Sequence, residues 1–411
     1  MVELIKNKVD CCGCSACVQA CPKSCLSMKS DEEGFLYPIK EEKDCIDCGL
    51  CERVCPLKKR HEKLRCKDAY AVMNLDEHER MASSSGGVFI KLAKEILRYG
   101  GVVFGVVFDD NYGAHHVAAS SLEQVIPMLG SKYLQSNIVN TYREALSYLK
   151  ENRLVLFTGS PCQIKGLYSF LRNKDYANLI TMDFLCHGVP SPGIWGRYFK
   201  ENFCVVKNNP PLAEVGKNSV LNSSLNAISP IGDVKFRDKF ESGWKKFRFV
   251  VRQKSAFKAD QNTVLLSDIY YDNPYMKGFL SDLYLRPACY ECRCKNGASQ
   301  SDITIGDYWG VKEVDKELDD DKGLSIVMLN SGKGQELFIH LDGLRLKEIS
   351  LEDAKRLNGG FCEHIIPHPK RGKFFRLVND KGYRVDKAVE KCLTRTIADK
   401  FVDKLKSIYK K

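Results

Sequence analysis

Eight cysteines near the start of the chain fall into two copies of one spacing, C-x2-C-x2-C-x3-C-P, offset by 34 residues from Cys11 to Cys45. The copies comprise Cys11, Cys14, Cys17, Cys21 and Pro22, then Cys45, Cys48, Cys51, Cys55 and Pro56. Three closely spaced thiolates can wrap one iron-sulfur cube, while the fourth reaches the cube of the other copy. We therefore predict two 4Fe-4S clusters, one held by Cys11, Cys14, Cys17 and Cys55 and the other by Cys45, Cys48, Cys51 and Cys21.

Zinc is the alternative cofactor for such a set of thiols. A zinc ion takes four ligands in pairs, whereas eight cysteines in one repeated spacing match two cubes, so we favour iron. The chain has 19 cysteines, but a disulfide scaffold would be short and loop-rich. Cys12, Cys25 and Cys66 lie outside the spacing, and we treat them as bystanders. No C-x3-C-x2-C triplet occurs, which argues against a radical enzyme that uses S-adenosylmethionine.

Composition narrows the class of protein further. The 411 residues carry a formal net charge of +11, and two cysteine-ligated clusters would lower that charge by about 4. The remaining positive charge is spread out, so a solvated basic surface is favoured over a nucleic-acid site, which would need a basic stripe interleaved with aromatic residues. No apolar run reaches the roughly 18 residues of a membrane span, and the start lacks a signal peptide. We expect a cytoplasmic protein.

The helices and strands that would position further functional residues begin after a charged connector at 57–68. Strands are expected at 69–74, 102–108, 154–159, 246–252 and 325–329, and helices at 88–99, 141–150, 161–173 and 275–286, the alternation of an α+β or α/β fold. Ser160 can cap the third of these helices, and Pro161 can take its first position. Residues 205–232 are expected to be an irregular insertion.

Six ordered segments of this larger region resemble the coenzyme F420 hydrogenase/dehydrogenase beta-subunit family. They are S-S-S-G-G (83–87), G-S-K-Y-L-Q-S (130–136), F-T-G-S-P-C-Q-I (157–164), F-L-C-H-G-V-P-S-P (184–192), R-P-A-C-Y-E-C (286–292) and S-D-I-T-I-G-D-Y-W-G (301–310). The resemblance runs from residue 68 to about 365. It implies a flavoprotein that binds FAD and carries one more 4Fe-4S cluster in its catalytic domain.

The chemistry of the residues in these segments is consistent with the implied FAD and cluster sites. Serines and glycines before a helix can hold a pyrophosphate on backbone amides, and Lys132 and Tyr133 can add a charge and a stacking face. The expected FAD-binding residues are Ser84, Ser85, Gly86, Gly87, Ser131, Lys132, Tyr133, Thr158, Gly159, Ser160 and Asp307, with Asp302 and Trp309 also at family positions. For the third cluster we expect Cys162, Cys186, Cys289 and Cys292, with Cys294 as an open substitute, because strand-to-helix loops gather at one sheet edge. His187 is a candidate proton donor, although an isolated histidine is more often structural.

Four parts of the chain are expected. They are a small two-cluster ferredoxin-like domain at 1–66, the FAD phosphate-loop part of a larger mixed α/β flavin-binding domain at 67–150, its cluster and flavin part at 151–365, and a basic tail at 366–411. The expected function is an oxidoreductase that passes electrons between a ferredoxin-like or deazaflavin donor and a small organic substrate, in either direction. The alternative is a non-catalytic electron-transfer subunit of a larger complex. We expect no nucleic acid and no membrane span, and we leave homo-oligomer formation open.

Overall fold

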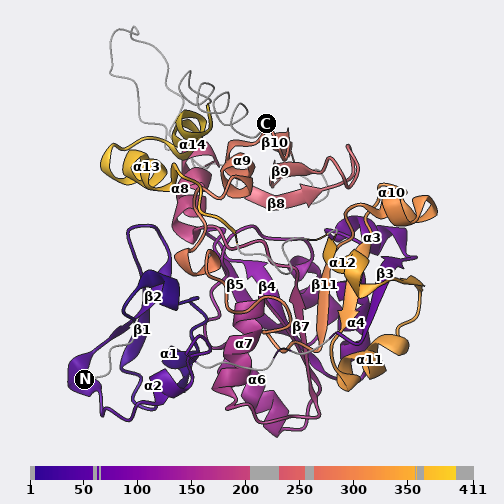
Figure 1. Ribbon diagram of the computed structural model, residues 1–411, viewed down its shortest axis with the longest axis horizontal. Helices are drawn as coiled ribbons and strands as arrows, with labels where there is room; N and C mark the ends of the chain where they lie inside the picture. The colour runs from indigo at the N-terminus through magenta and orange to yellow at the C-terminus, as the bar shows by residue number, and fades with distance from the viewer. Residues whose placement is uncertain are drawn as a thin grey trace, which may run out of the picture.

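The structure is a computed structural model that describes residues 5–58, 63, 66–203, 231–254, 263–356, 358 and 365–394. Residues 5–58 form a small module at the side of the molecule (Figure 1). Strands β1 (Leu26–Ser30) and β2 (Leu36–Lys40) pair antiparallel, and the short helices α1 (Ala16–Ala20) and α2 (Leu50–Arg53) follow the two cysteine loops.

The sequence repeat in this module is also a repeat of backbone conformation. Gly13 and Ser15 have positive φ in the first cysteine loop, and Asp47 and Gly49, each 34 positions later, have positive φ in the second. The helices begin at Ala16 and Leu50, which keep the same offset. The two loops therefore present their cysteines on matching turns, as a duplicated half-domain predicts.

An eight-stranded sheet forms the body of the molecule, in the order β13-β3-β12-β11-β7-β6-β4-β5. Its strands are β3 (Asp68–Asn74), β4 (Val102–Phe108), β5 (Ala114–Ala119), β6 (Val155–Thr158), β7 (Leu179–Phe184), β11 (Ile303–Asp307), β12 (Ser325–Leu329) and β13 (Leu344–Glu348). Strands β4, β6, β7 and β11 run parallel to one another, so their carboxyl ends share one edge of the sheet. This mixed sheet with helices on both faces confirms the predicted α/β class.

Alternating apolar side chains fix which helix covers which face of the sheet. In β6, Val155 and Phe157 pack in the cluster that contains helix residues Tyr142 and Ile164, whereas Leu156 packs on the other face. The helices of the body are α3 (Glu77–Ala82), α4 (Val88–Arg98), α5 (Leu122–Val125), α6 (Thr141–Lys150), α7 (Pro161–Phe170), α10 (Val311–Val314), α11 (Gly332–Ile339) and α12 (Leu351–Arg356). The face with α6 and α7 also receives the cysteine module, so the two share one core.

A second layer lies beyond the carboxyl edge of the large sheet (Figure 1). It contains the three-stranded sheet β10-β9-β8. Its elements are β8 (Ile231–Asp238), β9 (Arg248–Gln253), β10 (Thr263–Ile269), α8 (Pro192–Phe203), α9 (Pro274–Leu280), α13 (Arg371–Phe375) and α14 (Val385–Leu393). Trp195, Phe236 and Tyr275 are buried together in its aromatic core.

Three sequence expectations are corrected in this layer. The segment 366–411 is not a basic tail over its described part, because Phe374 and Val385 of α13 and α14 are buried in the aromatic core. The expected irregular insertion at 205–232 ends inside β8, which begins at Ile231, and the rest of it lies outside the described residues. Helix α9 is also shorter than expected and ends at Leu280.

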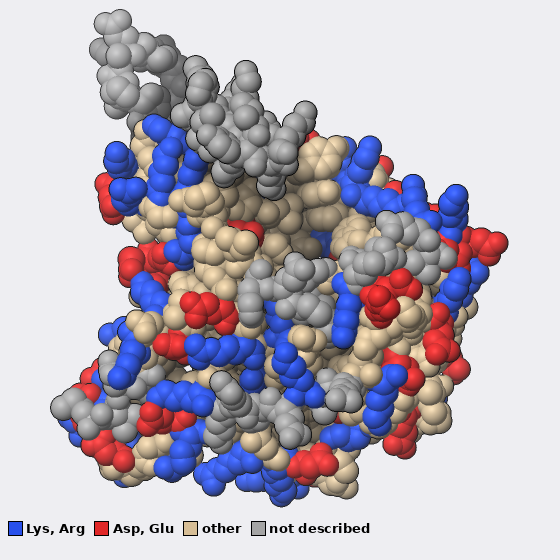
Figure 2. Space-filling view, viewed as in Figure 1, with Lys and Arg blue, Asp and Glu red and all other residues tan. Residues whose placement is uncertain are grey.

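The distribution of charged side chains on the surface is relevant to the predicted partners. Figure 2 shows lysine and arginine interspersed with aspartate and glutamate over the face in view, as the interpretation of a solvated basic surface predicts. None of the helices in the described ranges is long and apolar enough to cross a membrane.

Candidate metal centres and cofactor site

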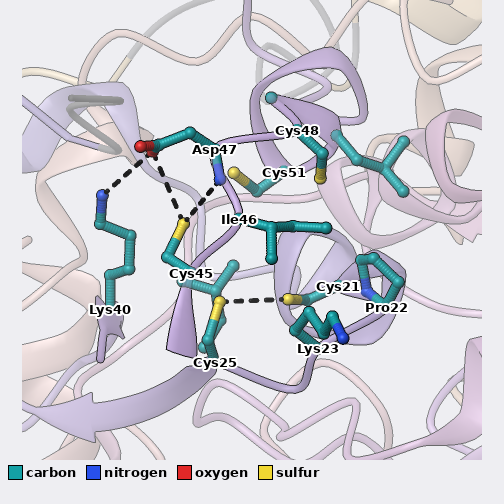
Figure 3. Close-up of a pocket in the computed structure, with 13 residues that line it drawn as sticks. Cys21, Pro22, Lys23, Cys25, Lys40, Cys45, Ile46, Asp47, Cys48 and Cys51 are labelled. Atoms are coloured by element: carbon teal, nitrogen blue, oxygen red, sulfur yellow. Dashed lines mark hydrogen bonds and ion pairs between the residues drawn. The ribbon is translucent and has the colours of Figure 1, made fainter. Parts of the chain in front are cut away.

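The second predicted cluster site is an open recess in the cysteine module. Its lining includes all four cysteines predicted for this cluster, namely Cys21, Cys45, Cys48 and Cys51. Figure 3 shows their sulfur atoms around the recess, together with Cys25. The Cys25 sulfur lies 3.4 Å from that of Cys21, so this residue, taken as a bystander from the sequence, belongs to the wall of the site.

The first predicted site lies deeper, against helix α7. Burial, and then the neighbouring thiols of Cys11 and Cys55, raise the pKa of Cys17 to about 12. Cys55 comes from the second copy of the motif, so the structure brings the fourth cysteine to the other copy's loop as cross-ligation requires. Because iron binds thiolates, cluster insertion must displace the protons of these buried thiols.

A zinc ion would need its ligands within about 2.3 Å of one point. Among the residues described, no group of three or more histidine, cysteine, aspartate or glutamate side chains is gathered in that way.

The cysteines predicted for the third cluster also come together. Cys162 lies in the first turn of α7, whose cap is a capping box between Ser160 and Gln163. Cys186 follows β7, and Cys289 ends the 3-10 helix Pro287–Cys289. Burial, followed by the thiols of Cys289, Cys162 and Cys292, raises the pKa of Cys186 well above its usual value.

Two further thiols flank this inner group. Cys294 is buried beside Cys292, and hydrogen bonding between the two raises the pKa of Cys294. Cys12 interacts with Cys14 of the first site and with Cys162 of the inner group. Nothing in the sequence pointed to Cys12, since its contact with Cys162 joins residues 150 positions apart. The first site and the inner group are therefore adjacent.

The two segments expected to hold the FAD phosphates meet. The Ser84 hydroxyl oxygen accepts bonds from the Ser131 amide at 2.6 Å and the Ser131 hydroxyl at 2.9 Å. Gly86, however, donates its amide to Ser325, and a side chain there would lie 2.3 Å from the Val72 carbonyl oxygen. Gly86 is thus required by strand packing, while Gly87, at φ +79°, caps α4.

Other residues expected at the cofactor are already bonded within the chain. Gly159 and Ser160 donate their amides to the Met182 carbonyl and the Gln163 side chain, and the Thr158 hydroxyl donates to the Phe104 carbonyl. The Lys132 ammonium bonds to the backbone carbonyls of residues 127–130, and burial lowers its pKa to about 8. These four residues shape the edge of the sheet but offer no free donors from those groups.

Two buried cations at the same edge were not predicted from the sequence. Arg237, at the end of β8, donates to Asp307 at 2.5 Å with a side chain only 3% exposed. Its Nε and Nη2 atoms have no hydrogen-bond partner among the described residues. Lys239 lies behind the serine loop, where its ammonium bonds to the carbonyls of Arg80, Ser85 and Lys322, and burial lowers its pKa to about 7.

Aromatic rings surround this arginine. Trp309 stacks on Trp244 with ring centroids 4.4 Å apart, and the Arg237 guanidinium lies 5.6 Å from the Trp309 ring centroid. Trp244 also donates to Asp307. Phe184, at the end of β7, and Trp309 remain partly exposed. A partly open apolar surface next to an unsatisfied buried cation suits a ligand with both a ring and an anionic group.

His187, the candidate proton donor, bonds to Asp282 at 2.7 Å, and its side chain is 42% exposed. Phe279 packs against the ring edge-on. The carboxylate fixes the orientation of the imidazole, and the residue is open to solvent next to Cys186.

Comparisons with known proteins find matches to two parts of the chain. Residues 152–353 match the family model for the C-terminal part of the coenzyme F420 hydrogenase/dehydrogenase beta subunit, and residues 10–59 match the 4Fe-4S dicluster domain. No curated protein matches the chain. A chain of the F420-reducing NiFe hydrogenase complex from Methanosarcina barkeri, from a xenon-derivatization study, is 16% identical with a TM-score of 0.42, and the match covers 80% of this chain and 92% of that one.

The paired cysteine loops and the dicluster match define an iron-sulfur electron-transfer protein. Residues 152–353 carry the C-terminal domain of the coenzyme F420 hydrogenase/dehydrogenase beta-subunit family, which confirms the resemblance noted in the sequence over that range.

Proposed function

We propose that the protein is an oxidoreductase that binds FAD and a third 4Fe-4S cluster in the larger domain. Its partners would be a ferredoxin-like protein or a reduced deazaflavin and a small organic substrate. The observation that carries this proposal is the gathering of three features at the carboxyl edge of the large sheet. They are the inner thiols, the Ser84–Ser131 contact and the half-paired Arg237.

The proposed roles follow from the donor atoms and apolar surface that each residue leaves available to a ligand. The Nε and Nη2 atoms of Arg237 are buried and proposed to bind an anionic group of the cofactor, while Asp307 bonds to Nη1 and the Tyr133 hydroxyl interacts with the same guanidinium. Trp309 and Phe184 offer apolar surface to a flat ring. Cys162, Cys186, Cys289 and Cys292 are the proposed ligands of the third cluster, with Cys294 as a substitute.

A flavin at this edge would exchange electron pairs with a substrate and single electrons with the clusters. The chain's own part is to hold that group near the inner thiols. Ser160 bonds to the Cys162 sulfur at 3.3 Å and thereby links the sheet edge to the proposed cluster. His187 is the proposed proton donor, held in orientation by Asp282.

Cofactor content after anaerobic purification tests the proposal. We expect about twelve irons and one flavin per chain, against about eight irons and no flavin if only the two N-terminal clusters are present. Replacing both Cys162 and Cys186 by serine should remove about four irons and leave the N-terminal clusters in place. About eight irons without flavin in the unmodified protein would overturn the proposal.

A variant pair separates the flavin site from general damage. Arg237→Gln should lower flavin content and leave iron content intact, since its side chain contacts Asp307 and aromatic rings and lies away from the cysteines. Arg98→Gln changes an exposed arginine of α4 that pairs with Glu95 and should leave both contents unchanged. A non-catalytic subunit would hold the same cofactors but show no turnover with reduced ferredoxin or reduced deazaflavin.

A further inference from the structure

The first cysteine of each motif copy has a charged neighbour, and the two neighbours carry charges of opposite sign. Cys11 and Cys45 occupy equivalent positions, 34 residues apart, on loops with matching backbone turns. The Arg286 guanidinium lies 3.7 Å from the Cys11 sulfur. An Asp47 carboxylate oxygen lies 3.7 Å from the Cys45 sulfur. The first cysteine sulfur thus contacts a cation in one site and a carboxylate in the other, where Lys40 also lines the recess.

Arg286 is a buried cation whose bonds go to neutral groups. The residue is 1% exposed, and its guanidinium donates to the carbonyls of Cys11 and Leu36 and to the Gln135 side chain, at 2.8 to 2.9 Å. It also stacks over Tyr37 at 4.3 Å. Among the described residues no carboxylate bonds to it.

A buried charge without a counter-charge is costly, so an anion is expected next to it. The thiolate of Cys11 is the charged partner within reach, and a cluster with four cysteinates carries roughly two negative charges when oxidised. The first site supplies the missing anion. Arg286 also comes from the loop that carries Cys289, so it lies between the module and the inner group.

Asp47 has the opposite relation to the second site. Its backbone amide donates to the Cys45 sulfur at 3.4 Å, and its side chain is 63% exposed, with Lys40 at 3.9 Å. Figure 3 shows Asp47 and Lys40 on the Cys45 side of the recess. Solvent and Lys40 weaken the field of this carboxylate, so its effect should be smaller than that of Arg286.

We propose that Arg286 and Asp47 set the order of the two N-terminal potentials, so that an added electron is favoured at the first site over the second. Reduction adds negative charge to a cluster, which a buried cation favours and a nearby carboxylate opposes. One electron leaves the second cluster, which is oxidised, and the first cluster is reduced, with no atom transferred. The exposed site thereby passes electrons toward the buried one. This inference depends on the dicluster module and not on the flavin.

Redox titration followed by electron paramagnetic resonance tests the order. Arg286→Gln should lower the potential of the first cluster. The ratio of one-electron occupancy between the first and the second cluster should then change at least tenfold, which corresponds to 59 mV. Arg286→Lys retains the charge and should recover most of that shift. Asp47→Asn should raise the potential of the second cluster by a smaller amount and leave the first unchanged.

Arg371→Gln is the matched control. Arg371 also joins the module to the larger domain, but it pairs with the Glu33 carboxylate and donates to the Leu285 carbonyl. It should weaken the contact without moving the potential of the first cluster. Equal shifts in Arg286→Gln and Arg371→Gln, or unchanged potentials in Arg286→Gln, would overturn the proposal. If Arg286→Gln loses iron, the Asp47→Asn variant tests the proposal instead. An unchanged potential of the second cluster in that variant would contradict the proposal.

Discussion

At the scale of single residues, Cys48 offers a direct test of the second cluster. It is exposed in the second cysteine loop, so serine there should not disturb packing. We expect Cys48→Ser to lose between about one and about four irons per chain, because a cube with three thiolates sheds an iron or dissociates. Cys66→Ser is the control, since Cys66 lies outside the motif and donates to the Asp68 carbonyl. Equal iron in the two variants and the unmodified protein would contradict the assignment.

His116 provides a pH-dependent prediction. It is buried, with its ring nitrogens bonded to the Thr158 carbonyl and Ser136, and burial lowers its pKa to about 4. The unfolded chain binds this proton below about pH 6.5, whereas the folded chain does so only near pH 4, so stability falls as the pH falls between these values. The loss should reach roughly 2 kcal/mol at pH 5.

Thermal midpoints at pH 7 and pH 5 measure this effect. The drop should be smaller in His116→Gln than in the unmodified protein, because glutamine binds no proton. His78→Gln removes an exposed histidine of α3 and should leave the drop unchanged. An undiminished drop in His116→Gln would assign the acid sensitivity to other groups.

The 4Fe-4S dicluster domain could be predicted from the sequence because the cysteine spacing is local, and each motif copy spans only eleven residues, as from Cys11 to Cys21. The cations were not predictable in this way. Arg286 meets Cys11 across 275 positions of sequence, and Arg237 meets Asp307 across 70. A lone arginine carries no pattern, so only the fold shows that its charge is buried and incompletely paired.

At the scale of elements, helix α7 ties the sheet edge to the first cluster site. A Cβ atom added at Gly166 would lie 2.8 Å from the Cys14 Cβ and 2.8 Å from the Tyr142 hydroxyl. Gly166→Ala should therefore cost about 1 to 3 kcal/mol of stability through overpacking. Gly196→Ala, in α8 with no atom within 4 Å, should instead gain up to about 1 kcal/mol from helix propensity. Melting curves distinguish the two, and a stabilised Gly166→Ala would refute the close contact.

Elements with strong local patterns were predicted well. Helix α6 occupies the expected residues 141–150, and Pro161 begins α7 after the Ser160 cap. The strands at 102–108 and 325–329 are also as expected. In the second layer β9 and α9 were expected, whereas β8, α13 and α14 were not, because they are held by the aromatic core, which gathers residues from Ala114 to Cys392.

At the scale of the whole molecule, the two N-terminal sites differ in their access to solvent. Ile46 beside the second site is 58% exposed, whereas Cys14 and Ala16 of the first loop are buried with α6 and α7 in one core. Gly34 and Gly193 also press together where the module meets α8, since a side chain on either glycine would lie within 2.6 Å of the other's Cα. The module is therefore docked by its first loop together with Val54 and Leu57, and the side of the second site that carries Ile46 faces outward.

This asymmetry predicts that an iron chelator removes the clusters in order. We expect a fast phase of about four irons per chain from the second site, followed by slower release from the enclosed sites. Absorbance of the iron-chelator complex over time, with paramagnetic resonance of samples taken between the phases, measures the order. Cys48→Ser should lack the fast phase and keep the slow ones, since only the outward site has been removed. A single phase in the unmodified protein, or a fast phase that persists in Cys48→Ser, would mean that enclosure by α7 does not protect the first cluster.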